Sequence, residues 1–179
     1  YPEPISDFDI QNYACKNDTV EVLYQAMADT NIAGINGQII DYVEWTTIDP
    51  SGTITNYPNW GPNNLVFNPN VSGTWKVNLK VISNTGCISV SNDSLLVYDL
   101  PKSAFTIIPD SSCSANGTTI FDGSISNPSV ANNPIVYWNW NFDDPNRQPL
   151  LNQLTPSTSN NYSVTGSYVV NLLVEDNRG

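Results

Sequence analysis

Hydrophobic and polar residues alternate with a period of two along much of the chain. In residues 75–82 every second side chain is apolar, namely Trp75, Val77, Leu79 and Val81. On a pleated strand this period places the apolar set on one face, toward a core, and the polar set in water. Further strand-like runs at 19–24, 39–46 and 94–98 are separated by Gly, Pro, Asn and Asp clusters. The pattern predicts an all-β chain of the β-sandwich type.

Two stretches of the chain recur at nearly the same spacing. Residues 73–86 align without a gap with residues 166–179, at an offset of 93. Residues 40–45 align with residues 135–140, at an offset of 95. A period of this size indicates tandem copies of one structural unit. By the same alternation, Tyr168 occupies the position of Trp75 on the core face of its strand.

The repeat predicts two domains of unequal length. Because the copies meet near residues 99–102, we expect a first sandwich at residues 1–100 and a second at residues 101–179. The segment 87–98 ends the first copy and has no counterpart in the second. The second sandwich is therefore expected to lack its last strand, which leaves an edge open to strand addition by a partner.

Charge and composition exclude several functions. Seventeen acidic and six basic residues give a net charge of -11, which repels phosphate backbones, so we expect no nucleic-acid binding. The apolar runs are far shorter than the roughly 18 residues of a membrane helix, so no membrane insertion is expected. Solubility must depend on neutral polar groups, since 25 residues are asparagine. The start lacks a charged leader and apolar signal core, so we expect that either a targeting segment has been removed or the chain is an internal fragment, and we favour the fragment.

The chain contains no histidine, which removes most hydrolase mechanisms. A Ser-His-Asp triad, a Cys-His pair and an imidazole metal site all need that residue. Paired carboxylates remain available to a glycosidase. Asp143 and Asp144, however, are adjacent at a strand end and point to opposite faces, so they cannot easily flank one bond. We expect no enzymatic activity.

Three segments of the second copy resemble the signature segments of polycystic-kidney-disease (PKD) domains, an immunoglobulin-like β-sandwich family. They are residues 120–124, 137–144 and 166–179. The family usually has Trp-x-Phe-Gly-Asp-Gly where this chain has Trp-Asn-Phe-Asp-Asp-Pro from Trp140, and the first copy departs further. The resemblance implies two tandem immunoglobulin-like sandwiches, with Trp45 and Trp140 at the position of the buried core tryptophan.

The three cysteines follow the repeat. Cys15 heads the first copy and Cys87 follows its penultimate strand, while Cys113 is the counterpart of Cys15. The counterpart of Cys87 would lie at position 180, so Cys113 is expected to have lost its partner by truncation. We predict a Cys15–Cys87 disulfide, which would imply an oxidising, extracytoplasmic setting. The alternative is two buried free thiols.

This cysteine placement is similar to that of tandem repeats in large surface proteins of the Bacteroidota, including gliding-motility adhesins exported by the type IX secretion system. The resemblance implies a non-enzymatic extracellular spacer, adhesive stalk or accessory module at the bacterial cell surface. Its expected partners are neighbouring repeats of the same chain, and a surface glycan or another cell-surface protein.

An Asn-rich loop offers a second function. Tyr57 and Trp60 lie among turn-forming residues, where exposed rings would stack on sugars and amides would bond hydroxyls. This surface would suit a glycan-binding or polysaccharide-binding accessory module of an extracellular hydrolase. The alternative is that Trp60 folds back to cover the end of the sandwich.

The carboxylates that follow the core strand of the second copy are candidate metal ligands. If their loops share one end of the sandwich, Asp143 and Asp144 would face Asp176. Oxygen ligands of this kind suit Ca²⁺, which takes six to eight of them. The simpler interpretation is that these side chains cap local turns. No other cofactor is expected.

Overall fold

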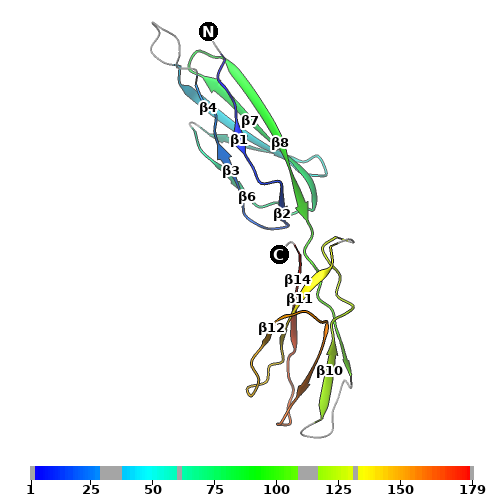
Figure 1. Cartoon of the computed structure of the whole chain (residues 1–179). Coiled ribbons are helices and arrows are strands. Elements are labelled where there is room, and N and C mark those ends of the chain that lie inside the picture. The colour runs from blue at the N-terminus through cyan, green and yellow to red at the C-terminus, as the bar shows by residue number, and fades with distance from the viewer. Residues whose placement is uncertain (1–2, 29–37, 60–61, 109–116, 131–132, 178–179) are drawn as a thin grey trace. The chain divides into compact units, whose positions relative to one another are not determined.

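The structure, a computed structural model, describes residues 3–28, 38–59, 62–108, 117–130 and 133–177. These ranges contain fourteen strands and no helix (Figure 1). Accordingly, no helix in the described ranges has the length and apolar character needed to span a bilayer. The chain divides into two compact units, Tyr1–Asp99 and Leu100–Gly179. We call these unit one and unit two.

Unit one is built from two sheets. One sheet has the order β1-β3-β6, and the other has the order β2-β8-β7-β4-β5. Their bounds are Phe8–Asp9 for β1, Val20–Tyr24 for β3, Leu65–Phe67 for β6, Tyr13–Cys15 for β2, Ile88–Tyr98 for β8, Gly73–Ser83 for β7, Ile40–Ile48 for β4 and Ile54–Asn59 for β5. All pairs are antiparallel except β2 and β8, which run parallel. This is the arrangement of an immunoglobulin-like sandwich.

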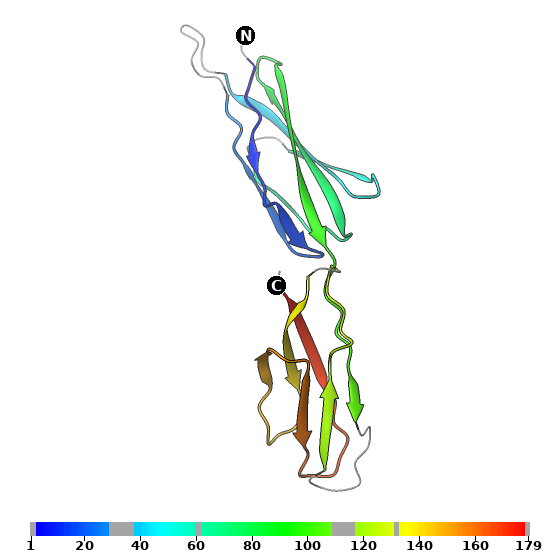
Figure 2. The same cartoon turned by 45° about the vertical axis from the view of Figure 1, so that its right-hand side comes forward.

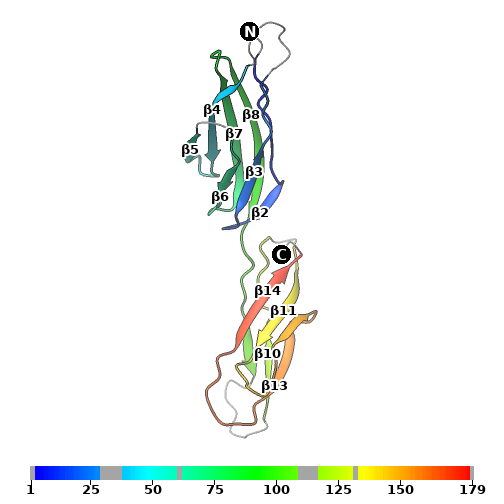
Figure 3. The same ribbon diagram turned by 90° about the vertical axis from the view of Figure 1, so that its left-hand side faces the viewer.

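The core of unit one lies between these two sheets (Figure 3). The predicted alternation of β7 holds, since Trp75 is 7% exposed and Val77, Leu79 and Val81 are 0% exposed. They pack with the inward side chains of β3 and β6 in a cluster of fourteen buried residues among those described. Burial of this one face drives strand pairing, because each fully buried aliphatic side chain contributes about 1.5 to 3 kcal/mol.

Unit two repeats this design with fewer strands. Its sheets have the orders β13-β10-β9 and β12-β11-β14. Their bounds are Ser157–Asn161 for β13, Thr118–Asp122 for β10, Thr106–Ile108 for β9, Leu150–Gln153 for β12, Ile135–Asn141 for β11 and Asn171–Asp176 for β14. By the sequence repeat for β11 and β14, and by strand order for the others, β9 to β14 correspond to β1, β3, β4, β5, β6 and β7. The described residues of unit two contain no counterpart of β8 (Figure 2, with β14 in red).

A small aromatic core holds unit two together. Its buried members among the described residues are Phe121, Trp140, Phe142, Leu172 and Val174. The ring centroids of Trp140 and Phe142 lie 6.1 Å apart in nearly parallel planes, and Phe121 lies 5.1 Å from Phe142. The two units together confirm the predicted all-β, immunoglobulin-like sandwich fold.

Candidate functional site

The structure does not form the predicted Cys15–Cys87 disulfide. Cys15 pairs with Tyr98, the last residue of β8, whereas Cys87 directly precedes the first. Along an extended strand these positions lie about 35 Å apart. A disulfide needs Cα atoms within about 7 Å. The prediction was wrong because the sequence repeat shows the order of the strands along the chain but not which residues lie opposite one another in the sheet. Cys113 lies outside the described residues.

The carboxylates proposed for Ca²⁺ do not meet. Asp143 and Asp144 follow Asn141, which pairs with Asn171, while Asp176 pairs with Ile135 at the other end of the β11–β14 ladder. Five or six residues along a strand correspond to about 17 to 20 Å. Within the described part of the chain, no three Asp, Glu or Cys side chains cluster as metal ligands would.

Asp144 and Asp143 instead accept hydrogen bonds from backbone N–H groups and from one buried amide. Asp144 is 9% exposed; its Oδ1 accepts from the backbone N of Asn146 at 2.9 Å and its Oδ2 accepts from Nδ2 of Asn160 at 3.1 Å. Asp143 Oδ2 accepts from the backbone N of Val169 at 3.2 Å. The Asn146 contact is a local turn cap, as the simpler interpretation expected. The Asn160 and Val169 contacts instead join segments that are distant in the sequence.

The Asp144 network extends to an arginine. Arg147 Nη1 donates to the backbone oxygen of Ser159 at 2.6 Å and to Oδ1 of Asn160 at 2.8 Å. Its guanidinium carbon lies 4.8 Å from the centre of the Phe142 ring. Buried polar groups of this kind need partners, and here amide and guanidinium supply them. The network holds the loop after β11 against β13.

Asp176 closes a loop at the opposite end of unit two. It is 3% exposed, and its Oδ2 accepts from both the backbone N of Ser129, at 3.2 Å, and the Ser129 hydroxyl. Since Ser129 lies in the 123–130 connection, Asp176 ties that connection to the end of β14. All three aspartates therefore have structural contacts.

Tyr57 does not form an exposed platform. It lies in β5 opposite Trp45 and packs, half-buried, against the core of unit one. Trp45 is 2% exposed, and its Nε1 donates to the backbone oxygen of Asn63 at 3.0 Å. The other predicted ring of the platform, Trp60, lies outside the described residues.

Two further predicted core residues belong to unit two. Trp140 is 0% exposed, and its Nε1 has no hydrogen-bond partner among the described residues. Tyr168, the counterpart of Trp75, is half-buried and stacks on Tyr162 with ring centroids 4.0 Å apart. Burial raises the pKa of Tyr162, whose hydroxyl donates to the backbone oxygen of Phe142.

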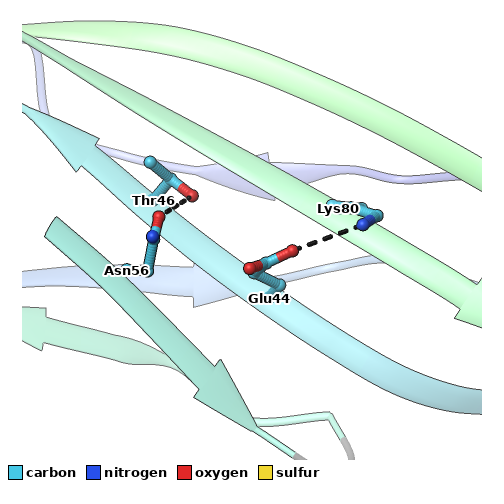
Figure 4. Close-up of polar contacts among 4 residues, drawn as sticks. All are labelled: Glu44, Thr46, Asn56 and Lys80. Atoms are coloured by element: carbon cyan, nitrogen blue, oxygen red, sulfur yellow. Dashed lines mark hydrogen bonds and ion pairs between the residues drawn. The ribbon is translucent and has the colours of Figure 1, made fainter. Parts of the chain in front are cut away.

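The outer face of the five-stranded sheet carries a row of neutral polar side chains. Thr46 lies opposite Asn56 on one side and Asn78 on the other, and Asn78 lies opposite Asn92. Thr46 Oγ1 donates to Asn56 Oδ1 at 3.1 Å, as Figure 4 shows. Alternation along one strand predicted that such residues face water, but only the register shows that they form one row across four strands.

An ion pair lies next to this row. Lys80 Nζ lies 3.4 Å from Oε2 of Glu44 across the β4–β7 ladder (Figure 4). The Lys80 side chain is 40% exposed and that of Glu44 is 27% exposed, so water screens the attraction. Pairs of this kind contribute about 0 to 1 kcal/mol. The face is a solvated sheet surface of neutral polar side chains with one partly exposed ion pair.

Comparison with known proteins assigns no family. No protein-family model and no curated protein matches the chain. Among solved structures, the chain is similar to carbohydrate-binding modules of the β-sandwich superfamily, with 14% identity, 97% of this chain and 84% of that chain covered, and a TM-score of 0.44. It is also similar to fibronectin(III)-like modules of Clostridium thermocellum CbhA, with 10% identity, 97% and 86% covered, and a TM-score of 0.42.

A third similar structure belongs to a 1.5-MDa bacterial ice-binding adhesin, with 11% identity, 90% of this chain and 55% of that chain covered, and a TM-score of 0.41. Matches at this level support no assignment of family or function. The resemblance to PKD domains therefore stays a prediction.

Proposed function

We propose that the chain is a non-enzymatic spacer or adhesion repeat of a large extracellular surface protein, extending or presenting other modules. The supporting observation is the path of the chain through unit one. Ser6 contacts the hydroxyl of Ser89, near the first residue of β8, and the chain leaves the unit after Tyr98, the last. The eleven residues of β8 correspond to about 34 Å. The unit therefore advances the chain from one end of the sandwich to the other.

The pairing of β2 with β8 suits such a role under tension. The two strands run parallel, and the backbone N of Lys16 donates to Tyr98 O at 2.8 Å while that of Leu96 donates to Asn12 O at 3.0 Å. A pull on the two ends of the chain draws parallel neighbours in opposite directions. Their hydrogen bonds are then loaded together in shear instead of one after another.

The extracellular location and the Bacteroidota origin rest on the resemblance of the repeat. The acidic, Asn-rich composition is compatible with a solvated surface protein, while the absent Cys15–Cys87 bridge removes one argument for an oxidising compartment. The glycan-binding alternative loses one of its two predicted rings, because Tyr57 packs against the core, while Trp60 lies outside the described residues.

Single-molecule force spectroscopy tests the spacer proposal. With the 179-residue chain held at its termini, we expect unit one to unfold in one step. About 90 residues at roughly 3.5 Å each, less the folded length of about 34 Å, give a lengthening of about 280 Å. Gradual lengthening in many small steps at low force would contradict a load-bearing role.

A pair of variants isolates the shear contact. Lys16→Pro removes the donor to Tyr98 O, so the unfolding force should fall more than the denaturant midpoint does. Asp99→Ala is the matched control, because it removes only the Lys16–Asp99 ion pair of 3.6 Å, whose side chains are 35% and 48% exposed. A pair of that kind contributes little, so the unfolding force should not change.

A further inference from the structure

The two related strands β7 and β14 have different neighbours. In unit one, β7 lies between β4 and β8, and ten residue pairs join it to β8, from Gly73 with Val97 to Ile82 with Ile88. In unit two, β14 pairs with β11 on one side and is the last strand of its sheet. The other side of β14 is thus a free edge among the described residues.

The missing neighbour changes the strand itself. Residues 73–77 belong to β7, whereas their counterparts 166–170 are outside any strand. Val77 is 0% exposed and its counterpart Val170 is half-buried. Further along, Leu172 and Val174 are 9% and 5% exposed, where the corresponding side chains of β7 are 0% exposed. Unit two therefore keeps the inward side chains of this strand but covers them less well.

Of the usual edge-protecting features, β14 carries only one inward carboxylate, Asp176, which has a partner inside the unit. Natural sheet edges are usually protected by lysine, proline, bulges or inward charges. The sequence of β14 is Asn-Leu-Leu-Val-Glu-Asp, with neither lysine nor proline. Its two carboxylates have partners inside the unit, since Glu175 accepts from Asn139 at 2.7 Å and Asp176 accepts from Ser129. The outward Leu173 is 62% exposed.

We propose that the free edge of β14 accepts an antiparallel strand with the pattern of β8, supplied from outside residues 1–179. The donor strand is defined by applying the β7–β8 register to unit two, where each β7 residue corresponds to the residue 93 positions later. The residues opposite Gly166 and Tyr168 are apolar, as Val97 and Leu95 are opposite Gly73 and Trp75. Those opposite Val170, Leu172 and Val174 are polar, as Asp93, Ser91 and Ser89 are.

A second copy of the chain does not fit this role. Its β8 strand is already paired with β7 along its length and with β2 at its end. Antiparallel pairing with a suitable donor would extend β14 back to residue 166, because residues 73–77 are held in the same way by β8. The proposal does not depend on the spacer role.

A peptide supplies the donor in the decisive experiment. The 179-residue chain is titrated with a peptide of residues 87–98 that carries Cys87→Ser, and amide hydrogen exchange is followed by NMR. We expect saturable slowing of exchange in residues 166–176, with unit one unchanged. A control peptide with Leu95→Asn and Val97→Asn should bind about tenfold more weakly or worse, because two apolar side chains are no longer buried.

The same sequence can be attached directly. A chain extended after Gly179 by a copy of residues 87–98 should show a higher unfolding midpoint for unit two and strand-like protection at residues 166–170. The proposal is overturned if neither the peptide nor the extension changes exchange in residues 166–176. It is also overturned if β14 becomes protected by self-association as the chain is concentrated alone. Neither result bears on the force response of unit one.

Discussion

Two tryptophans at equivalent core positions differ in one hydrogen bond. Trp45 Nε1 donates to Asn63 O at 3.0 Å, whereas Trp140 Nε1 is buried without a partner among the described residues. A net hydrogen bond contributes about 0.5 to 1.5 kcal/mol, and a buried polar group left unpaired costs about 1 to 3 kcal/mol. The same side chain thus fits its site in unit one better than in unit two.

Substitution by phenylalanine should reveal this difference. Both Trp45→Phe and Trp140→Phe lose part of a buried ring, but only Trp45→Phe also loses a hydrogen bond, while Trp140→Phe removes an unpaired N–H. We expect Trp45→Phe to lower the free energy of unfolding of its unit by at least about 1 kcal/mol more than Trp140→Phe does. Urea unfolding of each unit followed by NMR measures both losses. Equal losses would show that the Trp140 N–H has a partner.

Residue burial was predictable from the sequence where alternation fixes a face, as in β7. Polar partners were not, because they depend on which loops meet. Asp143 and Asp144 lie beside Val169 and Asn160, while Asp176 lies beside Ser129. The sequence places all these residues in turns or at strand ends, and turn chemistry alone does not show which end of a sheet a turn occupies.

At the scale of elements, the β4–β5 hairpin depends on one carboxylate. Asp49 Oδ1 accepts from the Ser51 hydroxyl at 2.6 Å, the Ser51 backbone N at 2.8 Å and the Thr53 backbone N at 2.8 Å. Gly52 completes the turn with a φ of 90°, which suits glycine. The hydrogen bonds from the Ser51 hydroxyl and then from the Thr53 backbone N lower the pKa of Asp49.

Acid should therefore loosen this hairpin. A carboxyl whose pKa is lower in the folded state stabilises the fold above its unfolded pKa, and the effect disappears as the pH falls through the folded pKa. We expect Asp49→Ala to speed amide exchange in β4 and β5 at neutral pH and to match the parent chain in strong acid. Asp9→Ala, at an exposed position in β1, should leave this hairpin unchanged. A difference between Asp49→Ala and its parent that persists in acid would contradict the mechanism.

Elements were predictable where one face is apolar over several residues. The run predicted at residues 94–98 is the end of a strand that begins at Ile88. Its first half has polar residues on the inward side, Ser89, Ser91 and Asp93, so periodicity did not reveal it. That half is a strand because it pairs with β7. The short strands β1 and β2 give no periodic signal at all.

At the scale of the whole molecule, two cores of different size lie in one chain. Unit one buries fourteen core residues and unit two buries five, among those described. The buried residues of each cluster belong to one unit. Stability grows with the apolar surface buried, so the two units should not be equally stable. The sequence predicted the tandem organisation, but the difference in core size follows from strand pairings that no single strand pattern reveals.

Denaturation of the 179-residue chain should consequently occur in two transitions, with unit two unfolding first. Leu79 and Leu172 are equivalent in the repeat and serve as matched markers. Leu79→Ala should lower the free energy of unfolding of unit one alone and so shift only the later transition. Leu172→Ala should lower that of unit two alone and shift only the earlier one. Each loss should be about 2 to 5 kcal/mol if the site cannot collapse around the cavity. Hydrogen exchange followed by mass spectrometry along a urea series assigns each transition to its unit. One transition shifted equally by both variants would mean that the two cores unfold as a single cooperative unit.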